Sequence, residues 1–544
     1  MSHKNKKIKR RTKTSYIAEL GILVADIYLI FIFCLLPLLY RNNYIDIQTY
    51  KYQAFKIVTI PVVLILFILF VTEKILKRVS ENTSNIQSIH KSKEIIRRWI
   101  YRNFPVLCLL LFAAVLIIST VASLWPHECW TGERGRLMGT EGLLLCAGSA
   151  LAVAYRGRIN RYMLWAFAAV NTVAALIGIL NFWGNDVLGM YVNLNPVQHS
   201  FFIGTVGNKN VTANYLCLIA PAALGLFYFS KQKTERILLS VFSVSVVYYG
   251  FAASSDSFLL GCAGAALIML WFSLTEHQNM LKFFNCCVLF YISTWLMKLS
   301  LFIARVREIE SPFLSNYPTE GLISFCLSLK TLIISGIVFI VLVIAEYYLL
   351  SKKSQVAYRH VRKCVFLVLL AAGIVLAVLI CIANRQTGSG IQESSVLRRL
   401  VIPDSFGSNR GYIWRKAALL FGELPFIKKI IGAGPGSFYY LADAAFGDEM
   451  RQLYGDPFID AHCEPLHFLV TTGVLGVIGY FGAQISSVVL SLKKAKTRPE
   501  IIILGAAMLS YILQGSVNNP TVFATPQLFV MIGIAVSYKE KGVF

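Results

Sequence analysis

The sequence predicts an all-α polytopic membrane protein, and three observations carry this prediction. Of its 544 residues, 56% are hydrophobic and only 15% are charged, whereas a soluble chain carries about 25% charged residues. The mean hydropathy is +0.62. The apolar residues also gather in runs of about 20, the length that a helix needs to cross roughly 30 Å of hydrocarbon. This composition excludes a soluble enzyme, a disordered chain and a disulfide-framed secreted domain.

About fourteen apolar runs of this kind follow one another along the chain. They predict one membrane domain over residues 20–538, preceded by a basic tail at 1–19 and followed by a short tail at 539–544. The runs cover residues 20–40, 54–76, 105–125, 142–155, 162–183, 211–229, 237–253, 257–274, 283–304, 322–350, 365–383, 465–492, 501–515 and 521–538.

The charges of the connecting segments predict the topology. The chain has 52 Lys and Arg against 28 Asp and Glu, a net charge of +24. Alternate connectors are rich in Lys and Arg, and the positive-inside rule places these, with both termini, in the cytoplasm. The basic start of the chain has no apolar stretch ending in a cleavage site, so we expect no cleaved signal peptide. The net charge is therefore a topology signal, and nucleic acid is not an expected partner. The basic connectors are 77–102, 156–161, 231–236, 352–363, 493–498 and 539–541, and the charge-balanced ones are 41–51, 126–141, 184–210, 305–320 and 384–464.

The 12 cysteines lie mostly inside the apolar runs, where cysteine behaves as a small hydrophobe. The sequence has no CxxC pair and no regular cysteine spacing that would indicate a zinc site or a disulfide framework. Cys129 and Cys463 both lie in predicted outer connectors. The sequence leaves open whether they form a disulfide in an oxidising compartment.

The outer connector 384–464 is the one long stretch without an apolar run, and loops of this length are usually functional. Within it, residues 412–421 predict an amphipathic helix at the membrane interface, and Pro425 and the glycines at 432–436 end that pattern. Charged residues inside the apolar runs are few and fall mostly toward helix ends, where we expect structural roles.

Four motifs on the predicted outer side carry most of the polar residues suited to chemistry. They are WTGERGRLMG at 130–139, TVGNKNVTANY at 205–215, NRGYIWR at 409–415 with IIGAGPGSF at 430–438, and DAHCEPLHFLVTTGVLG at 460–476. In this order they resemble the O-antigen ligase and polymerase superfamily of bacterial membrane glycan transferases, from about Gly132 to the end of the chain. The resemblance implies a GT-C-like membrane fold. The family usually has Asn directly after the His of the last motif, where this chain has Cys463, so Glu464 or another group would have to replace that Asn.

The resemblance also implies a reaction, in which a glycan passes from an undecaprenyl-diphosphate carrier to an acceptor hydroxyl at the outer face of the bacterial cytoplasmic membrane. The departing diphosphate develops negative charge that fixed cations or Mg²⁺ must stabilise. Arg136 and Arg410 suit this role because a guanidinium matches phosphate oxygens, and no carboxylate cluster suggests Mg²⁺. We therefore expect no metal and no cofactor.

His462 would meet the acceptor and either take its proton or only orient it. Direct displacement by the acceptor predicts inversion at the anomeric carbon. The other residues expected to contact substrate are Asn208, Asn210, Trp414, Gly434, Gly436, Asp460 and Glu464.

Each candidate also has a structural interpretation. The arginines could anchor the chain at the interface, and His462 and His467 could be core residues. Asn208 and Asn210 could cap the next helix. The glycines could form a tight turn that lets the backbone approach a ligand.

Two further function classes compete with the transferase. A transporter or a flippase for lipid-linked oligosaccharides would show inverted repeats and polar residues at mid-membrane, and we find no convincing repeat. A noncatalytic scaffold accounts poorly for Arg, His and Gly-rich motifs on one side. Polymerase and ligase differ only in the acceptor, which could be a glycan, another lipid, a wall polymer or a protein. The sugar, the acceptor and the oligomeric state stay open.

Overall fold

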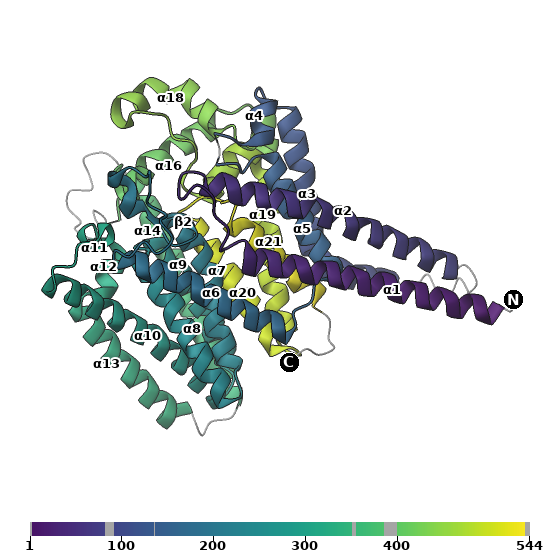
Figure 1. Cartoon of the computed structure of the whole chain (residues 1–544), viewed down its shortest axis with the longest axis horizontal. Coiled ribbons are helices and arrows are strands. Elements are labelled where there is room, and N and C mark those ends of the chain that lie inside the picture. The colour runs from purple at the N-terminus through teal and green to yellow at the C-terminus, as the bar shows by residue number, and fades with distance from the viewer. Residues whose placement is uncertain (1–2, 82–91, 135, 351–354, 386–399, 539–544) are drawn as a thin grey trace.

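The computed structural model describes residues 3–81, 92–134, 136–350, 355–385 and 400–538. This part of the chain is almost entirely helical, apart from one small antiparallel sheet in which β1 (Phe202–Ile203) pairs with β2 (Gly207–Asn208) (Figure 1). The α-helices are α1 (His3–Ile30), α2 (Ile47–Glu81), α3 (Ser92–Val121), α4 (Pro126–Thr131), α5 (Thr140–Arg156), α6 (Arg161–Phe182), α7 (Lys209–Phe229), α8 (Lys233–Ala252), α9 (Asp256–Ser273), α10 (His277–Val306), α11 (Pro312–Ser315), α12 (Gly321–Leu327), α13 (Leu329–Ala345), α14 (Gln355–Arg385), α16 (Phe406–Glu423), α17 (Phe426–Ile431), α18 (Phe438–Tyr454), α19 (Glu464–Lys494), α20 (Ile502–Gly515) and α21 (Ala524–Ser537). Short π or 3₁₀ turns lie at Phe31–Leu35, Pro196–Phe201, Glu346–Leu350 and Pro499–Ile501.

Within the described residues, eleven helices are long and apolar enough to cross a membrane. The predicted class, an all-α multi-pass membrane protein, is therefore confirmed. Every one of the fourteen predicted runs is helical, but three of them form α5, α20 and α21, which have 17, 14 and 14 residues. At 1.5 Å per residue these helices are about 21 to 26 Å long. Nearly all residues of α20 and α21 are buried. These two helices are therefore apolar because other helices surround them, and their apolar runs do not by themselves indicate that they span a membrane.

The predicted division of the connectors into two sets agrees with their contacts. At one end, the Tyr44 N–H donates to the Met190 carbonyl over 3.3 Å, and the Gln48 side chain donates to the Arg136 carbonyl over 3.2 Å. At the other end, Arg161 pairs with Glu235. In each of these contacts, the two connectors belong to the same predicted set. Residues 3–19 of the predicted basic tail continue α1 as helix, whereas the tail at 539–544 lies outside the described residues.

The central helices approach one another through small residues. A Cβ placed on Gly261 of α9 would lie 2.4 Å from the Cys217 sulfur and 2.8 Å from the Ser510 hydroxyl, so α9 packs closely against side chains of α7 and α20. In lipid, apolar surface gives little drive for helices to associate, and close van der Waals packing of this kind replaces it.

α19 is broken in its N-terminal third at Gly473, whose backbone angles are φ 67° and ψ −174°. The break removes the helical partners of two carbonyls. The N–H of Ala433 donates to Val470 over 3.1 Å, and the N–H of Gly434 donates to Thr471 over 2.8 Å. The loop that precedes α18 is thereby hydrogen-bonded to a membrane helix.

The amphipathic helix predicted at 412–421 forms the main part of α16. Its apolar residues Tyr412, Ile413, Ala417 and Leu420 are buried in a small cluster with Phe438 of α18 and Val470 of α19. The apolar face is therefore covered by protein, which differs from the expected contact with the membrane interface.

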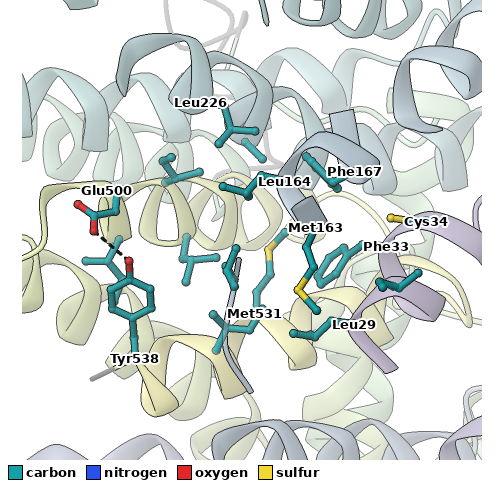
Figure 2. Close-up of a pocket in the computed structure, with 17 residues that line it drawn as sticks. Leu29, Phe33, Cys34, Met163, Leu164, Phe167, Leu226, Glu500, Met531 and Tyr538 are labelled. Atoms are coloured by element: carbon teal, nitrogen blue, oxygen red, sulfur yellow. Dashed lines mark hydrogen bonds between the residues drawn. The ribbon is translucent and has the colours of Figure 1, made fainter. Parts of the chain in front are cut away.

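A pocket of about 100 Å³ lies at the end of the bundle that is opposite to the four motifs, and apolar side chains line most of it (Figure 2). At its edge the Tyr538 hydroxyl donates to Glu500 over 2.9 Å. None of the predicted site residues lines this pocket.

Candidate functional site

The candidate site centres on an ion pair between two of the predicted residues. The Nε of Arg136, in the connector between α4 and α5, lies 2.7 Å from Oδ2 of Asp460. The Asp460 side chain is only 4% exposed and the Arg136 side chain 27% exposed. The second oxygen, Oδ1, accepts the backbone N–H of His462 over 3.0 Å. One carboxylate thus fixes both Arg136 and the loop that carries His462.

His462 adopts a left-handed backbone conformation with φ 47°, which is uncommon for a residue other than glycine. The Trp414 Nε1 donates to the His462 carbonyl over 3.4 Å. On the ring, Nδ1 lies 3.1 Å from Nδ2 of Asn519, and Nε2 lies 3.6 Å from Oδ1 of Asp460. The ring is therefore held between the loop's own carboxylate and an amide from the connector between α20 and α21.

The surroundings set the charges of this group. Burial disfavours a charged imidazole and lowers the pKa of His462; the Asp460 carboxylate opposes this, while the positive charges of Arg136 and Arg410 add to it. Burial alone would raise the pKa of Asp460, but Arg136 and the two histidines outweigh it and hold that pKa well below its usual range. At neutral pH the site holds a carboxylate, two guanidinium groups and a neutral imidazole.

Arg410 begins the regular part of α16, directly after Gly407, Ser408 and Asn409, all three of which are left-handed. This turn directs Arg410 toward the bundle, where burial lowers its pKa while the negative charges of Asp460 and Asp256 oppose that. No carboxylate among the described residues lies within ion-pair distance of Arg410, and its buried Nε has no hydrogen-bond partner there.

Lys209, the first residue of α7, is a third cation at the site. It interacts electrostatically with Arg410, and its Nζ lies 5.1 Å from the centre of the Phe201 ring. Lys209 is not among the residues predicted from the sequence. The signal that could have indicated it is its position between Asn208 and Asn210, two of the predicted residues.

The asparagines of this motif have mixed roles. Asn208 caps α7, since its side chain accepts the Asn210 N–H over 2.9 Å, which fits the structural interpretation. The Asn210 side chain accepts the Ser255 hydroxyl over 2.9 Å, and its carbonyl accepts from Asn518 over 3.2 Å. Asn210 therefore joins α7 to α9 and to the connector that carries Asn519.

Gly434 and Gly436 make close approaches to protein. Both have positive φ, 119° and 79°. A Cβ on Gly434 would lie 2.5 Å from the Cys129 sulfur, and one on Gly436 would lie 3.3 Å from the Glu128 carbonyl. These glycines let the loop before α18 pack on α4, beside the Arg136 connector, whereas the sequence suggested that they approach a ligand.

Glu464 lies within the helical core, although it was expected to contact substrate. It is fully buried, and its two oxygens accept the Tyr480 and Tyr511 hydroxyls, each over 2.9 Å. It thus joins α19 to α20 and does not replace the Asn that the family usually has after His462. The amide at His462 comes from Asn519, which was not predicted from the sequence.

Cys129 and Cys463 are both free, buried thiols. Burial raises the pKa of Cys463 to about 11, and burial likewise raises that of Cys129, whose sulfur lies 3.2 Å from the Ser123 hydroxyl. The structure therefore contains no disulfide between these two cysteines. Among the described residues, no group of three or more His, Cys, Asp and Glu side chains could hold a metal ion.

Comparison with known proteins matches residues 321–481 to the family model of the O-antigen ligase. The matched segment contains Arg410, Trp414, Gly434, Gly436, Asp460, His462 and Glu464, whereas Arg136, Lys209 and Asn519 lie outside it. No curated protein matches the chain. Through this segment, the chain is similar to the O-antigen ligase family.

Proposed function

We propose that the protein transfers a glycan from an undecaprenyl-diphosphate carrier to an acceptor hydroxyl, with inversion at the anomeric carbon and without a metal ion. The observation that supports this best is the convergence of Arg136 and Arg410 on His462, with Lys209 interacting with Arg410. Among the described residues, Asp460 is the one carboxylate paired with any of these three cations.

In this proposal the cations bind the diphosphate of the donor. Arg410 and Lys209 have no carboxylate partner in the described part of the chain, so an anionic ligand would satisfy both. As the acceptor oxygen attacks the anomeric carbon, the bond from that carbon to the phosphate oxygen breaks and the lipid diphosphate leaves with the electron pair. Fixed cations stabilise the developing charge without reorganising during the reaction.

His462 serves the acceptor. A lowered pKa keeps its imidazole neutral, which is the form that can take the hydroxyl proton as the new bond forms. Asp460 then stabilises the imidazolium, as a carboxylate beside a catalytic histidine does. Trp414 and Asp460 act on the loop that carries His462, and we assign them positioning roles.

The location proposed for this site is the outer face of the bacterial cytoplasmic membrane, with both termini in the cytoplasm. The Lys- and Arg-rich connectors, Arg161 among them, lie at the opposite end of the bundle from His462, and the positive-inside rule assigns that basic end to the cytoplasm. The acceptor is a glycan, a lipid or a wall polymer.

The test is transfer by purified protein in detergent or nanodiscs, with a synthetic polyprenyl-diphosphate oligosaccharide as donor and EDTA in all reactions. Arg410→Gln and His462→Ala should each lower the rate at least about a hundredfold. Arg415→Gln is the matched control, because Arg415 lies on the same helix and pairs with Asp404 near the surface. Normal rates for both site variants, or a strict requirement for a divalent metal, would refute the proposal.

A further inference from the structure

The amide of Asn519 is the one group on His462 that comes from the connector between α20 and α21. Asn519 is 4% exposed, and its backbone is held on both sides. Its carbonyl accepts the Asn214 amide over 2.7 Å, and its N–H donates to the Asn518 side chain over 3.0 Å. Its Nδ2 lies 3.1 Å from Nδ1 of His462, while its buried Oδ1 has no hydrogen-bond partner in the described part of the chain.

The chemistry of imidazole gives this contact a consequence. A neutral ring has one donor and one acceptor nitrogen, so the partner of Nδ1 decides which nitrogen carries the proton. With the NH₂ of Asn519 facing Nδ1, the proton is on Nε2 and points toward Asp460, 3.6 Å away. Neither nitrogen can then accept the proton of an acceptor hydroxyl.

A half-turn (about 180°) of the Asn519 side-chain amide favours the other tautomer of His462. Oδ1 of Asn519 then accepts from Nδ1–H, which gives the unpartnered oxygen a partner and leaves the lone pair of Nε2 free. We propose that Asn519 is a positioning residue that sets the tautomer of His462 and, through this half-turn, makes Nε2 the base of the reaction. The inference rests on the proposed transferase function.

The proton balance follows from this arrangement. The acceptor hydroxyl gives its proton to Nε2, and the ring becomes an imidazolium whose Nδ1–H stays bonded to Asn519 Oδ1. The charge is balanced by Asp460. The other charged or titratable groups near the ring are Arg136 and Arg410, from the connector before α5 and from α16, and His467 of α19. None of these is hydrogen-bonded to Nδ1, so the tautomer depends on Asn519.

The neighbouring residues do not replace Asn519 in this role. Cys463 directly follows His462, but its thiol is buried and protonated. The Asn518 amide donates to the Asn210 carbonyl and to the Asn214 side chain over 3.2 and 2.9 Å. Asn518 thus shares the environment of Asn519 without touching the ring, which makes it the matched control.

The experiment measures transfer rate against pH for two variants. Asn519→Asp can only accept from Nδ1–H, so it should keep transfer, and its carboxylate should favour the imidazolium and move the acid limb of the profile to higher pH. Asn519→Leu has a similar size and no hydrogen bond, and its rate should fall about a hundredfold with the KM for the donor unchanged. Asn518→Asp should leave the acid limb where it is.

The outcomes separate the two proposals. If Asn519→Leu transfers at the normal rate, or if Asn519→Asp and Asn518→Asp move the acid limb equally, Asn519 does not set the tautomer. The transferase function would still stand in that case, provided that His462→Ala is inactive. If Asn519→Leu does not fold, the comparison of the two Asp variants decides.

Discussion

Arg136 and Asp460, which are 324 residues apart in the sequence, form a largely buried ion pair with a distance of 2.7 Å between Nε and Oδ2. The pair joins the connector before α5 to the loop before α19. The other carboxylate oxygen accepts the His462 backbone N–H. The ion pair therefore connects Arg136, which is proposed to bind the diphosphate, to His462, the proposed base.

Asp460→Asn should therefore reduce both stability and transfer. Removing one partner of a buried pair leaves the other charge uncompensated, at a cost of about 3 kcal/mol, and His462 loses its fixed loop. Thermal unfolding in detergent and the transfer rate measure the two effects. Asp443→Asn is the control, since Asp443 pairs with Arg451 at the surface and its loss should change neither quantity.

Lys209→Gln should weaken donor binding about tenfold, because a charged hydrogen bond to the diphosphate is lost. The effect should appear in the KM for the lipid-linked donor. Lys416→Gln offers a matched comparison, since Lys416 bonds Glu449 on the outer helices and should leave that KM unchanged. An unaltered KM in Lys209→Gln would remove Lys209 from the donor site.

The transfer rate should hold as the pH falls through 6.5, the ordinary pKa of histidine. The pKa of His462 is lowered, so its neutral form persists to more acidic pH and the acid limb should lie below 6.5. A rate profile in mixed buffers from acidic to neutral pH measures this limb. An acid limb above 6.5 in the native protein would contradict the burial and the cationic surroundings described for His462.

Glu464→Gln should affect folding more than chemistry. Glu464 joins the Tyr480 and Tyr511 hydroxyls inside the bundle, and disturbing such buried hydrogen bonds costs about 1 to 3 kcal/mol. The melting temperature should fall while the rate per folded molecule stays near normal. Glu464 would instead be a substrate contact if transfer were lost at an unchanged melting temperature.

Gly473→Ala should destabilise the outer part of the protein by at least about 2 kcal/mol, because the backbone at this position is essentially restricted to glycine. The new methyl would also lie 2.4 Å from the Ile430 carbonyl. Gly422→Ala is a suitable control, since a Cβ there meets no described atom within 4 Å. Equal melting temperatures for the two variants would show that the backbone conformation at Gly473 does not contribute to stability.

The sequence was sufficient for the helices because burial in lipid and burial in a bundle both require apolar runs. It also named Arg136, Asp460 and His462 as candidates, since each lies in one of the four motifs, but it did not predict the Arg136–Asp460 ion pair. It missed Asn519, which lies in a short polar connector between two apolar helices without a pattern of its own. The contact of Asn519 with His462, across 57 residues, depends on how closely α20 packs against its neighbours.

It also misplaced Glu464. A carboxylate two residues after His462 was expected to lie in the same site, but α19 begins at Glu464. The first turn of the helix carries this side chain into the bundle, where Tyr480 and Tyr511 surround it. Residues close in the sequence can therefore point in different directions at the start of a helix, as His462 and Glu464 do.

The break in α19 has a further consequence for how substrates enter. Ala433 and Gly434 bond directly to carbonyls of this membrane helix, so the loop before α18 cannot lift away without exposing unpaired backbone groups at the outer rim. Opening this loop as a lid would therefore break two hydrogen bonds to α19. Under the proposed function, a lipid-linked donor would reach Arg136 and Arg410 while this loop stays in place.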